Sequence, residues 1–192
     1  MNYNIILASN SPRRKELLKG LDIDFEVRVL PDIDESYPPD MLSEEVPIFI
    51  AEKKADAYLA TLQKDELIIT ADTVVVLDGE IIEKPADKED AIHILKRLSG
   101  RKHQVITAVV LMTADVRKTF SVTSAVDFSE LTDEEITYYV EHYQPYDKAG
   151  AYGIQEWIGY IGVRAIEGSF YNVMGLPIQR LYQEIIKLKE II

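Results

Sequence analysis

The sequence predicts an α/β fold in which a mixed β-sheet is flanked by helices. Runs with the two-residue period of strands alternate along the chain with runs that have the helical period. The chain has 192 residues, of which 47% are apolar. A chain of this length buries about 70% of its unfolded surface, which is enough for a real core. No internal repeat or flexible linker is evident, so we expect one domain over residues 1–192, with two lobes sharing one fold.

Six segments have the composition of strands: 3–9, 67–77, 80–83, 103–113, 119–128 and 160–166. The pair Asp78-Gly79 lies between the second and the third of them and is a two-residue hairpin signal. Closing the hairpin with this loop places Thr73 opposite Lys84 and Asp72 opposite Pro85.

Five segments have the apolar spacing of helices: 12–20, 46–62, 87–100, 132–143 and 177–188. Ser11 followed by Pro12 is a typical helix start, and Thr132 with Glu135 forms a capping box. Residues 30–47 and 143–159 carry prolines or glycines and are expected to be irregular.

Composition excludes several classes of protein. The absence of cysteine rules out disulfides and cysteine-based metal sites. With 33 acidic and 21 basic residues the formal charge is −12, which disfavours binding to a nucleic acid polymer or an anionic membrane. No apolar run approaches the roughly 20 residues of a membrane helix, and the first apolar run is too short for a signal peptide. We therefore expect a cytoplasmic protein.

The segment from Ser9 to Arg14 is the first candidate binding site. It leads from a strand into a helix, whose first turn offers unpaired N–H groups and a partial positive charge. Arg13 and Arg14 fall in this unfavourable position, so an anion such as phosphate would explain them. The alternative is a pair of solvated arginines that bind acids such as Glu16, and the spacing alone does not decide between the two.

Asp72 is the second signal, because it interrupts the apolar run 67–77. A buried carboxylate costs several kcal/mol unless it is paired or binds a metal, which favours a functional role. The alternative is a position at a strand end, where Asp72 would cap a turn.

Three further residues are candidates only if other site residues lie close to them in the fold. Lys54 lies on an apolar helix stripe, where lysines usually extend to water, and Lys84 ends a strand, as surface lysines often do. The stretch 146–155 joins small residues to Gln155, an amide able to pair with a base edge, although a tight packing turn would look similar.

Familiar catalytic motifs are absent from this sequence. The three histidines lack metal spacing, no serine lies in a nucleophile elbow, and neither phosphate-binding glycine fingerprint occurs. Any catalysis would therefore use carboxylates, cations and a divalent metal.

The chain resembles the Maf family of nucleoside triphosphate pyrophosphatases. Six motifs in order over nearly the whole chain carry the resemblance: LASNSPRR, IAEKKA, ADTVVVLDGEIIEKP, LSGRKHQVITAV, DKAGAYGIQ and YNVMGLP. It implies an elongated mixed sheet with two lobes around a central cleft, similar to inosine triphosphate pyrophosphatases, and a homodimer. The DKAGAYGIQ motif resembles that of the subgroup acting on dTTP and UTP.

The resemblance also implies roles for individual residues. Asp72 would be the catalytic carboxylate and, with Glu35 rather than Asp34, a ligand of a divalent metal such as Mg²⁺, Mn²⁺ or Co²⁺. The residues implied in phosphate binding are Ser9, Arg13, Arg14, Lys54 and Lys84. Gln155 and Thr73 would belong to the part of the site that selects the substrate. Asn10 stands where the family often has alanine or glycine, and Tyr171 and Asn172 receive no role.

These residues would hydrolyse a nucleoside triphosphate to the monophosphate and pyrophosphate, which removes unwanted nucleotides. In the expected mechanism Asp72 deprotonates water and the surrounding cations keep it ionised. One alternative is a nucleotide-sensing regulator of septum formation that acts through a partner. Another is a phosphate-ester phosphatase, which would release orthophosphate.

Overall fold

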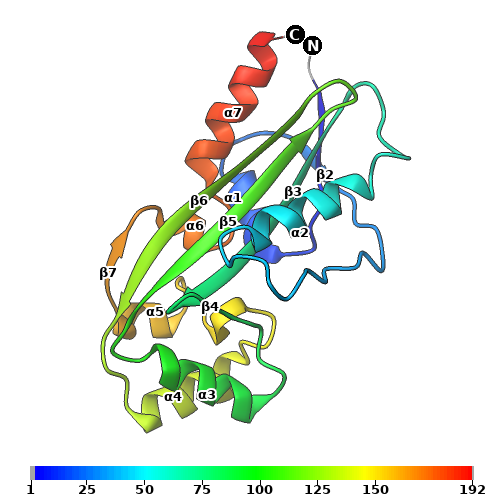
Figure 1. Cartoon of the computed structure of the whole chain (residues 1–192). Coiled ribbons are helices and arrows are strands. Elements are labelled where there is room, and N and C mark those ends of the chain that lie inside the picture. Colours follow the sequence, from blue (N-terminus) through cyan, green and yellow to red (C-terminus); the bar gives the residue numbers. More distant parts are fainter. Residues whose placement is uncertain (1–2, 192) are drawn as a thin grey trace. The chain divides into compact units, whose positions relative to one another are not determined.

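A computed structural model of the chain, which describes residues 3–191, confirms the α/β class. Seven strands form a mixed sheet in the order β2-β1-β3-β5-β6-β7, with β4 paired to β3 (Figure 1). The chain divides into two compact units. The first holds the residues up to Asp72, Thr107–Val122 and those from Gly175 on, and the second holds Thr73–Ile106 and Thr123–Met174.

The first unit is built on parallel strands. Its elements are β1 (Asn4–Leu7), α1 (Pro12–Lys19), β2 (Phe25–Val27), α2 (Val46–Asp56), the first part of β3 (Glu66–Leu77) and α7 (Ile178–Ile191), with parts of β5 (Lys102–Met112) and β6 (Arg117–Phe128). Strand β1 pairs in parallel with both β2 and β3. Ile6, Ile68, Ala51 and Tyr58 belong to one buried cluster, which packs α2 against the sheet.

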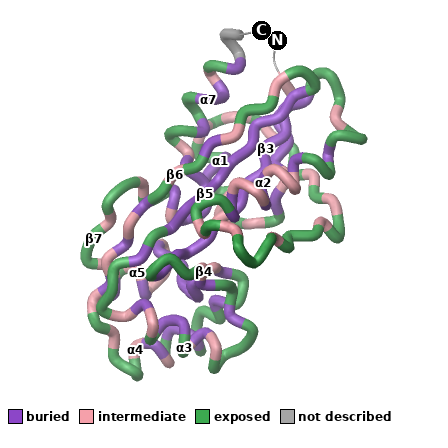
Figure 2. Tube along the Cα trace, viewed as in Figure 1, coloured by how far each residue is buried: buried purple, intermediate pink, exposed green. Residues whose placement is uncertain are grey.

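The second unit contains the remaining parts of β3, β5 and β6. Its other elements are β4 (Glu80–Ile82), α3 (Lys88–Leu98), α4 (Asp133–Tyr143), the short 3₁₀ helix η1 (Ala149–Ala151), α5 (Trp157–Gly162), β7 (Val163–Glu167) and α6 (Phe170–Val173). Phe128, Tyr139 and Leu95 are among its fully buried side chains. Buried residues follow β3 and β5 for most of their length (Figure 2).

Short-range signals in the sequence are confirmed. Ser11 caps α1, and Thr132 and Glu135 form the complete capping box of α4. The β3–β4 hairpin has the expected register, with Val75 opposite Ile82. The ladder ends at that pair, so the expected pairs that involve Lys84 and Pro85 lie beyond it.

Two boundaries were predicted wrongly. The expected strand 160–166 begins only at Val163, because residues 157–162 form α5. A Cβ on Gly159 would lie 1.8 Å from the carbonyl oxygen of Ile154, so the glycine permits this close turn. Helix α2 ends at Asp56 rather than near residue 62, since the N–H groups of Tyr58, Leu59 and Thr61 bond to carbonyls three residues back.

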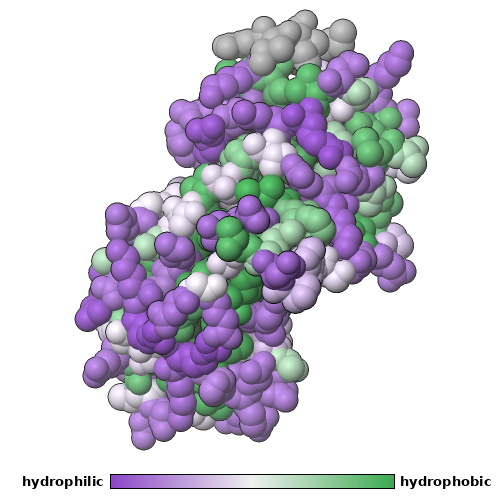
Figure 3. Space-filling view, in the orientation of Figure 1, coloured by the Kyte–Doolittle hydropathy of each residue, from purple (hydrophilic) through white to green (hydrophobic). Residues whose placement is uncertain are grey.

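One face of the molecule is mainly polar. Hydrophilic side chains cover most of the face shown in Figure 3. No described helix is long and apolar enough to cross a membrane.

Candidate active site

Six of the predicted site residues lie in the first unit: Ser9, Arg13, Arg14, Glu35, Lys54 and Asp72. They come from the turn after β1, from the first turn of α1, from the irregular segment 30–45, from α2 and from β3. Strand β1 pairs in parallel with the first part of β3 as far as Leu7 and Ile69, so the turn after β1 begins level with the stretch of β3 that leads to Asp72. The carboxyl end of a parallel strand is where such folds bind ligands.

Lys54 joins two of these carboxylates. Its Nζ atom lies 2.8 Å from Oδ1 of Asp72 and 3.1 Å from Oε1 of Glu35. The Lys54 side chain is only 13% exposed, so it turns inward instead of extending to water. Asp72 is buried within β3 and is paired, which excludes the alternative of a turn cap at a strand end.

Burial is the largest influence on Asp72. It raises the pKa of this carboxyl above its ordinary value, although Lys54 and Arg14 act in the opposite direction. Lys54 and Arg14 thus favour the ionised form, as expected from the sequence, while the larger opposing effect is the cost of removing the carboxylate from water. A raised pKa makes Asp72 a stronger base than an exposed aspartate.

The start of α1 is held by its own polar groups. The Ser11 hydroxyl accepts the N–H of Arg14, and the Ser9 hydroxyl accepts the N–H of Ser11 at 3.2 Å. Ser9 is buried, and Arg13 is half-buried in the same turn.

Arg14 links two backbone segments of the first unit through hydrogen bonds. Its Nε donates to the carbonyl of Gly175 at 2.8 Å, and its Nη1 donates to the carbonyl of Ala71 at 2.9 Å. Burial lowers the pKa of Arg14, while the charge of Asp72 raises it. These contacts exclude a solvated Arg14 and fix α1 beside Asp72, whereas phosphate binding by Arg13 and Arg14 stays a prediction.

The donor set suits a hard divalent cation. Glu35 and Asp72 already share one positive charge, the Lys54 ammonium group, and Mg²⁺ is commonly bound by one or two carboxylates together with substrate phosphates. Among the residues that the structure describes, no group of three or more His, Cys, Asp and Glu side chains is placed to hold a metal by itself. The two carboxylates therefore fit such a metal, whose remaining coordination positions substrate phosphates and water would fill.

The other three predicted residues belong to the second unit. Thr73 is half-buried directly after Asp72 in β3, and Lys84 is exposed just after β4. Gln155 is half-buried, but its Oε1 atom is buried and has no hydrogen-bond partner among the described residues. The roles of all three stay predictions.

Two polar networks escaped the sequence analysis. Asp34, Ser36 and Lys53 bind one another beside Glu35. In the second unit, the buried Lys148 lies 2.8 Å from Asp147 and 3.3 Å from Glu156. The adjacent lysines of IAEKKA were the available signal for the first network, but sequence spacing does not tell which acid each lysine reaches.

Comparison with known proteins assigns the family. The Maf profile, described as Maf-like protein, matches residues 4–188. The chain belongs to the Maf family. This Maf chain is 60% identical over 186 residues to a protein of Bacteroides thetaiotaomicron named dTTP/UTP pyrophosphatase, with 97% of this chain and 96% of the relative covered. It is 63% identical over 183 residues to one of Parabacteroides distasonis with the same name, with 95% of each covered.

Solved structures support the fold of the Maf chain. The Ham1 protein of Staphylococcus aureus matches with a TM-score of 0.52 at 22% identity, covering 94% of this chain and 99% of the other. A HAM1 protein from Coxiella burnetii matches with a TM-score of 0.50 at 14% identity, covering 96% and 99%. At these identities the likeness shows the fold alone.

Proposed function

We propose that this chain is a nucleoside triphosphate pyrophosphatase that hydrolyses dTTP and UTP to the monophosphate and pyrophosphate. The observation that carries the proposal is the buried Asp72 joined through Lys54 to Glu35. The curated relatives in the same family, named dTTP/UTP pyrophosphatase, support the choice of substrate.

In the proposed reaction Asp72 takes a proton from a water molecule. The water oxygen attacks the α-phosphorus, and the bond from that phosphorus to the bridging oxygen of the β-phosphate breaks, so pyrophosphate leaves. The raised pKa of Asp72 favours this role as general base. Arg13, Lys54 and Ser9 would bind phosphate oxygens, helped by the N–H groups at the start of α1.

Glu35 and Asp72 would hold the divalent cation. When bound, such an ion neutralises phosphate charge and polarises phosphorus–oxygen bonds. Lys54 would supply a second positive charge on the same side of the substrate, since it already contacts both carboxylates.

Gln155 would recognise the base. Thymine and uracil each carry an N3–H donor, and the buried Oε1 of Gln155 is an acceptor that lacks one. A site built around such a bond rejects analogues that leave its polar groups unpaired. Thr73 and Lys84 would complete the substrate contacts, and we propose from the family resemblance that the protein acts as a homodimer.

The test is a panel of nucleoside triphosphates with Mg²⁺ or Mn²⁺, assayed separately for pyrophosphate and orthophosphate. We expect pyrophosphate, with dTTP and UTP as the best substrates. Asp72→Asn should lower kcat by about 10²–10⁴-fold, because it removes the base and leaves the shape. Release of orthophosphate alone, or near-normal turnover by Asp72→Asn, would contradict the proposal.

The same panel tests the base contact. Gln155→Leu should lower kcat/KM for dTTP and UTP by about 10–100-fold, the effect of leaving a buried polar group unpaired. The loss should be smaller for CTP, whose N3 atom is an acceptor. Gln104→Leu, at an exposed position in β5 of the same unit, is the matched control. Equal losses for all three nucleotides would remove Gln155 from base selection.

A further inference from the structure

Glu35 is not held in place by a helix, by a strand or by burial of its side chain. It lies in segment 30–45, which forms no helix or strand, and its side chain is 50% exposed. A single exposed carboxylate–lysine contact contributes little free energy, because water screens it and two long side chains must be ordered. Its position beside Lys54 and Asp72 therefore depends on what fixes the backbone around it.

The residues on either side of Glu35 form a closed turn. Oδ1 of Asp34 accepts the N–H of Ser36 at 2.9 Å, and Oδ2 accepts the Ser36 hydroxyl at 2.8 Å. An aspartate that bonds the backbone two residues on defines the path of the residue between them. Here that residue is Glu35.

Lys53 attaches this turn to α2. Its Nζ donates to Oδ2 of Asp34 at 2.6 Å and to the carbonyl of Ser36 at 3.0 Å. We call Asp34, Ser36 and Lys53 the clip. Successive residues project about 100° apart around a helix, so Lys53 can hold the clip while Lys54 points to Asp72. Neighbouring lysines thus bind neighbouring acids, Lys53 with Asp34 and Lys54 with Glu35.

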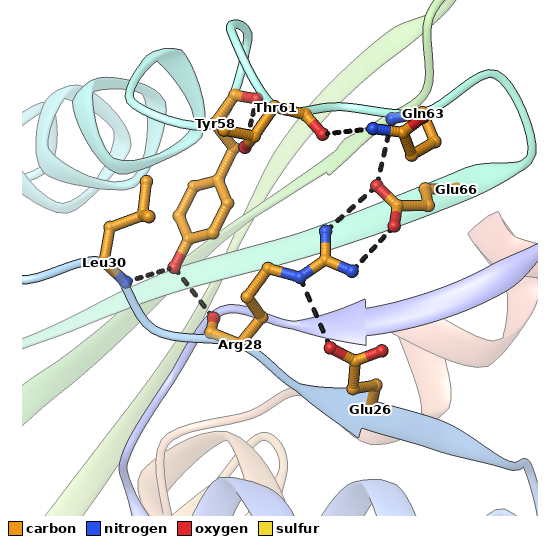
Figure 4. A network of polar contacts seen from close by, with 7 residues as sticks. All are labelled: Glu26, Arg28, Leu30, Tyr58, Thr61, Gln63 and Glu66. Carbon is orange, nitrogen blue, oxygen red and sulfur yellow. Dashed lines mark hydrogen bonds and ion pairs between the residues drawn. The ribbon is translucent and has the colours of Figure 1, made fainter.

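A second attachment fixes the start of the segment. The Tyr58 hydroxyl donates to the carbonyl of Arg28 at 2.8 Å and accepts the N–H of Leu30 at 3.1 Å (Figure 4). The Arg28 guanidinium in turn forms two bonds to the buried Glu66, of 2.7 and 3.1 Å. The chain that leads to Glu35 is therefore fixed to the first unit both upstream of it and at the clip.

We propose that Asp34 and Lys53 are positioning residues that hold Glu35 where it can bind a divalent cation with Asp72. This inference rests on the proposed function, because it assigns Glu35 to that metal site. Neither Asp34 nor Lys53 contacts the substrate in this mechanism. They restrict the conformations of Glu35 before the cation binds, so that binding costs less conformational entropy.

The test measures Mn²⁺ binding to the protein alone by titration calorimetry. Lys53→Gln should weaken Mn²⁺ binding by about fivefold, the effect of losing one exposed ion pair. The direction of this change in affinity separates positioning from electrostatics, because removing a nearby positive charge would by itself strengthen the binding of a cation. Lys53→Arg, which keeps the charge and the donors, should stay within about twofold of wild type.

Two further variants separate the effect of the clip on Glu35 from the general effects of losing a positive charge or an exposed ion pair. Arg117→Gln removes one positive charge and releases another exposed ion pair on α2, that with Asp56, so it should leave Mn²⁺ binding unchanged. In a Glu35→Gln background Lys53→Gln should cause no further weakening of Mn²⁺ binding, because the clip acts through Glu35. An equal loss with and without Glu35, unchanged binding in Lys53→Gln, or no measurable binding by the wild type would overturn the proposal.

The outcomes also distinguish this inference from the proposed function. If Lys53→Gln behaves as expected and no nucleotide yields pyrophosphate, the clip stands and the proposed reaction fails. If pyrophosphate is released and Lys53→Gln binds Mn²⁺ like the wild type, only the clip fails.

Discussion

The Asp72–Lys54 ion pair bears on both the stability of the first unit and the base strength of Asp72. Burying either charge alone would cost several kcal/mol, and the 2.8 Å contact offsets much of that cost. The burial that makes the pair expensive also raises the pKa of Asp72, which is the property a general base needs. The pair therefore constrains mutation at either position.

His103 is a second buried titratable residue, in the core of the second unit. Its Nε2 lies 2.8 Å from the Tyr152 hydroxyl, and its ring packs edge-on against Phe128 and Tyr152. Its Nδ1 is buried and has no hydrogen-bond partner within residues 3–191. Burial lowers the pKa of His103 to about 4 from its ordinary 6.5, so the folded protein keeps the ring neutral.

This shift makes stability depend on pH. The unfolded chain binds a proton at His103 below about pH 6.5 and the folded chain does not, so stability is full above that pH and falls as the pH drops toward 4. Between pH 7 and pH 5 the loss from this residue should be about 2 kcal/mol in the free energy of unfolding, measured by urea titration.

Variants isolate the contribution of His103. In His103→Gln the free energy of unfolding should change less between the two pH values than in wild type, whatever the pH-independent cost of the substitution. His93→Gln, at an exposed position of α3, should keep the wild-type dependence. A His103→Gln profile parallel to that of wild type would show that another group causes the loss.

At the scale of elements, local signals predicted the helix starts well. Ser11, Asp87 and Thr132 each cap a helix through a bond to a backbone N–H within three residues, and such bonds can be inferred from neighbouring residue types. Strand β2 was missed, because its three residues become a strand only by pairing with β1, about 20 residues away. Helix α5 was missed because short apolar runs fit either period.

Gly150 in η1 is an element-scale constraint that can be tested. Its φ is +71°, and an added Cβ would lie 2.9 Å from Cγ2 of Val75. Gly79 in the β3–β4 turn has a similar φ of +83°, but nothing lies within 4 Å of its added Cβ. The two positions therefore separate backbone strain from steric conflict.

Urea unfolding of the two alanine variants should give unequal losses. Gly79→Ala should lower the free energy of unfolding by about 1 kcal/mol, the cost of the left-handed backbone. Gly150→Ala should cost about 2–4 kcal/mol, since overpacking against Val75 is added. Val75→Ala combined with Gly150→Ala should recover part of the steric cost. Equal losses in the two single variants would mean that Val75 in β3 moves aside with no loss of stability, which would contradict the expected steric conflict.

At the scale of the whole molecule, the net charge and the state of assembly lead to a further prediction. The charge of −12 disfavours polyanions, and within the first unit Lys54 is already paired with the carboxylates of Asp72 and Glu35. A homodimer, as the resemblance implies, should sediment with twice the 21.9 kDa mass of the chain. Sedimentation velocity over a range of concentrations tests this, and a single species of 21.9 kDa throughout would contradict it.

The sequence by itself determined the α/β class, the helix caps, the hairpin register and the anomaly of a carboxylate inside an apolar strand. Each depends on residues close together in the chain, where spacing fixes geometry. Only the tertiary structure decided that Lys54 pairs with Asp72, that Lys53 holds the turn around Glu35, and that burial outweighs the cations at Asp72. These depend on contacts between segments distant in sequence and on the water that folding removes, neither of which residue spacing encodes.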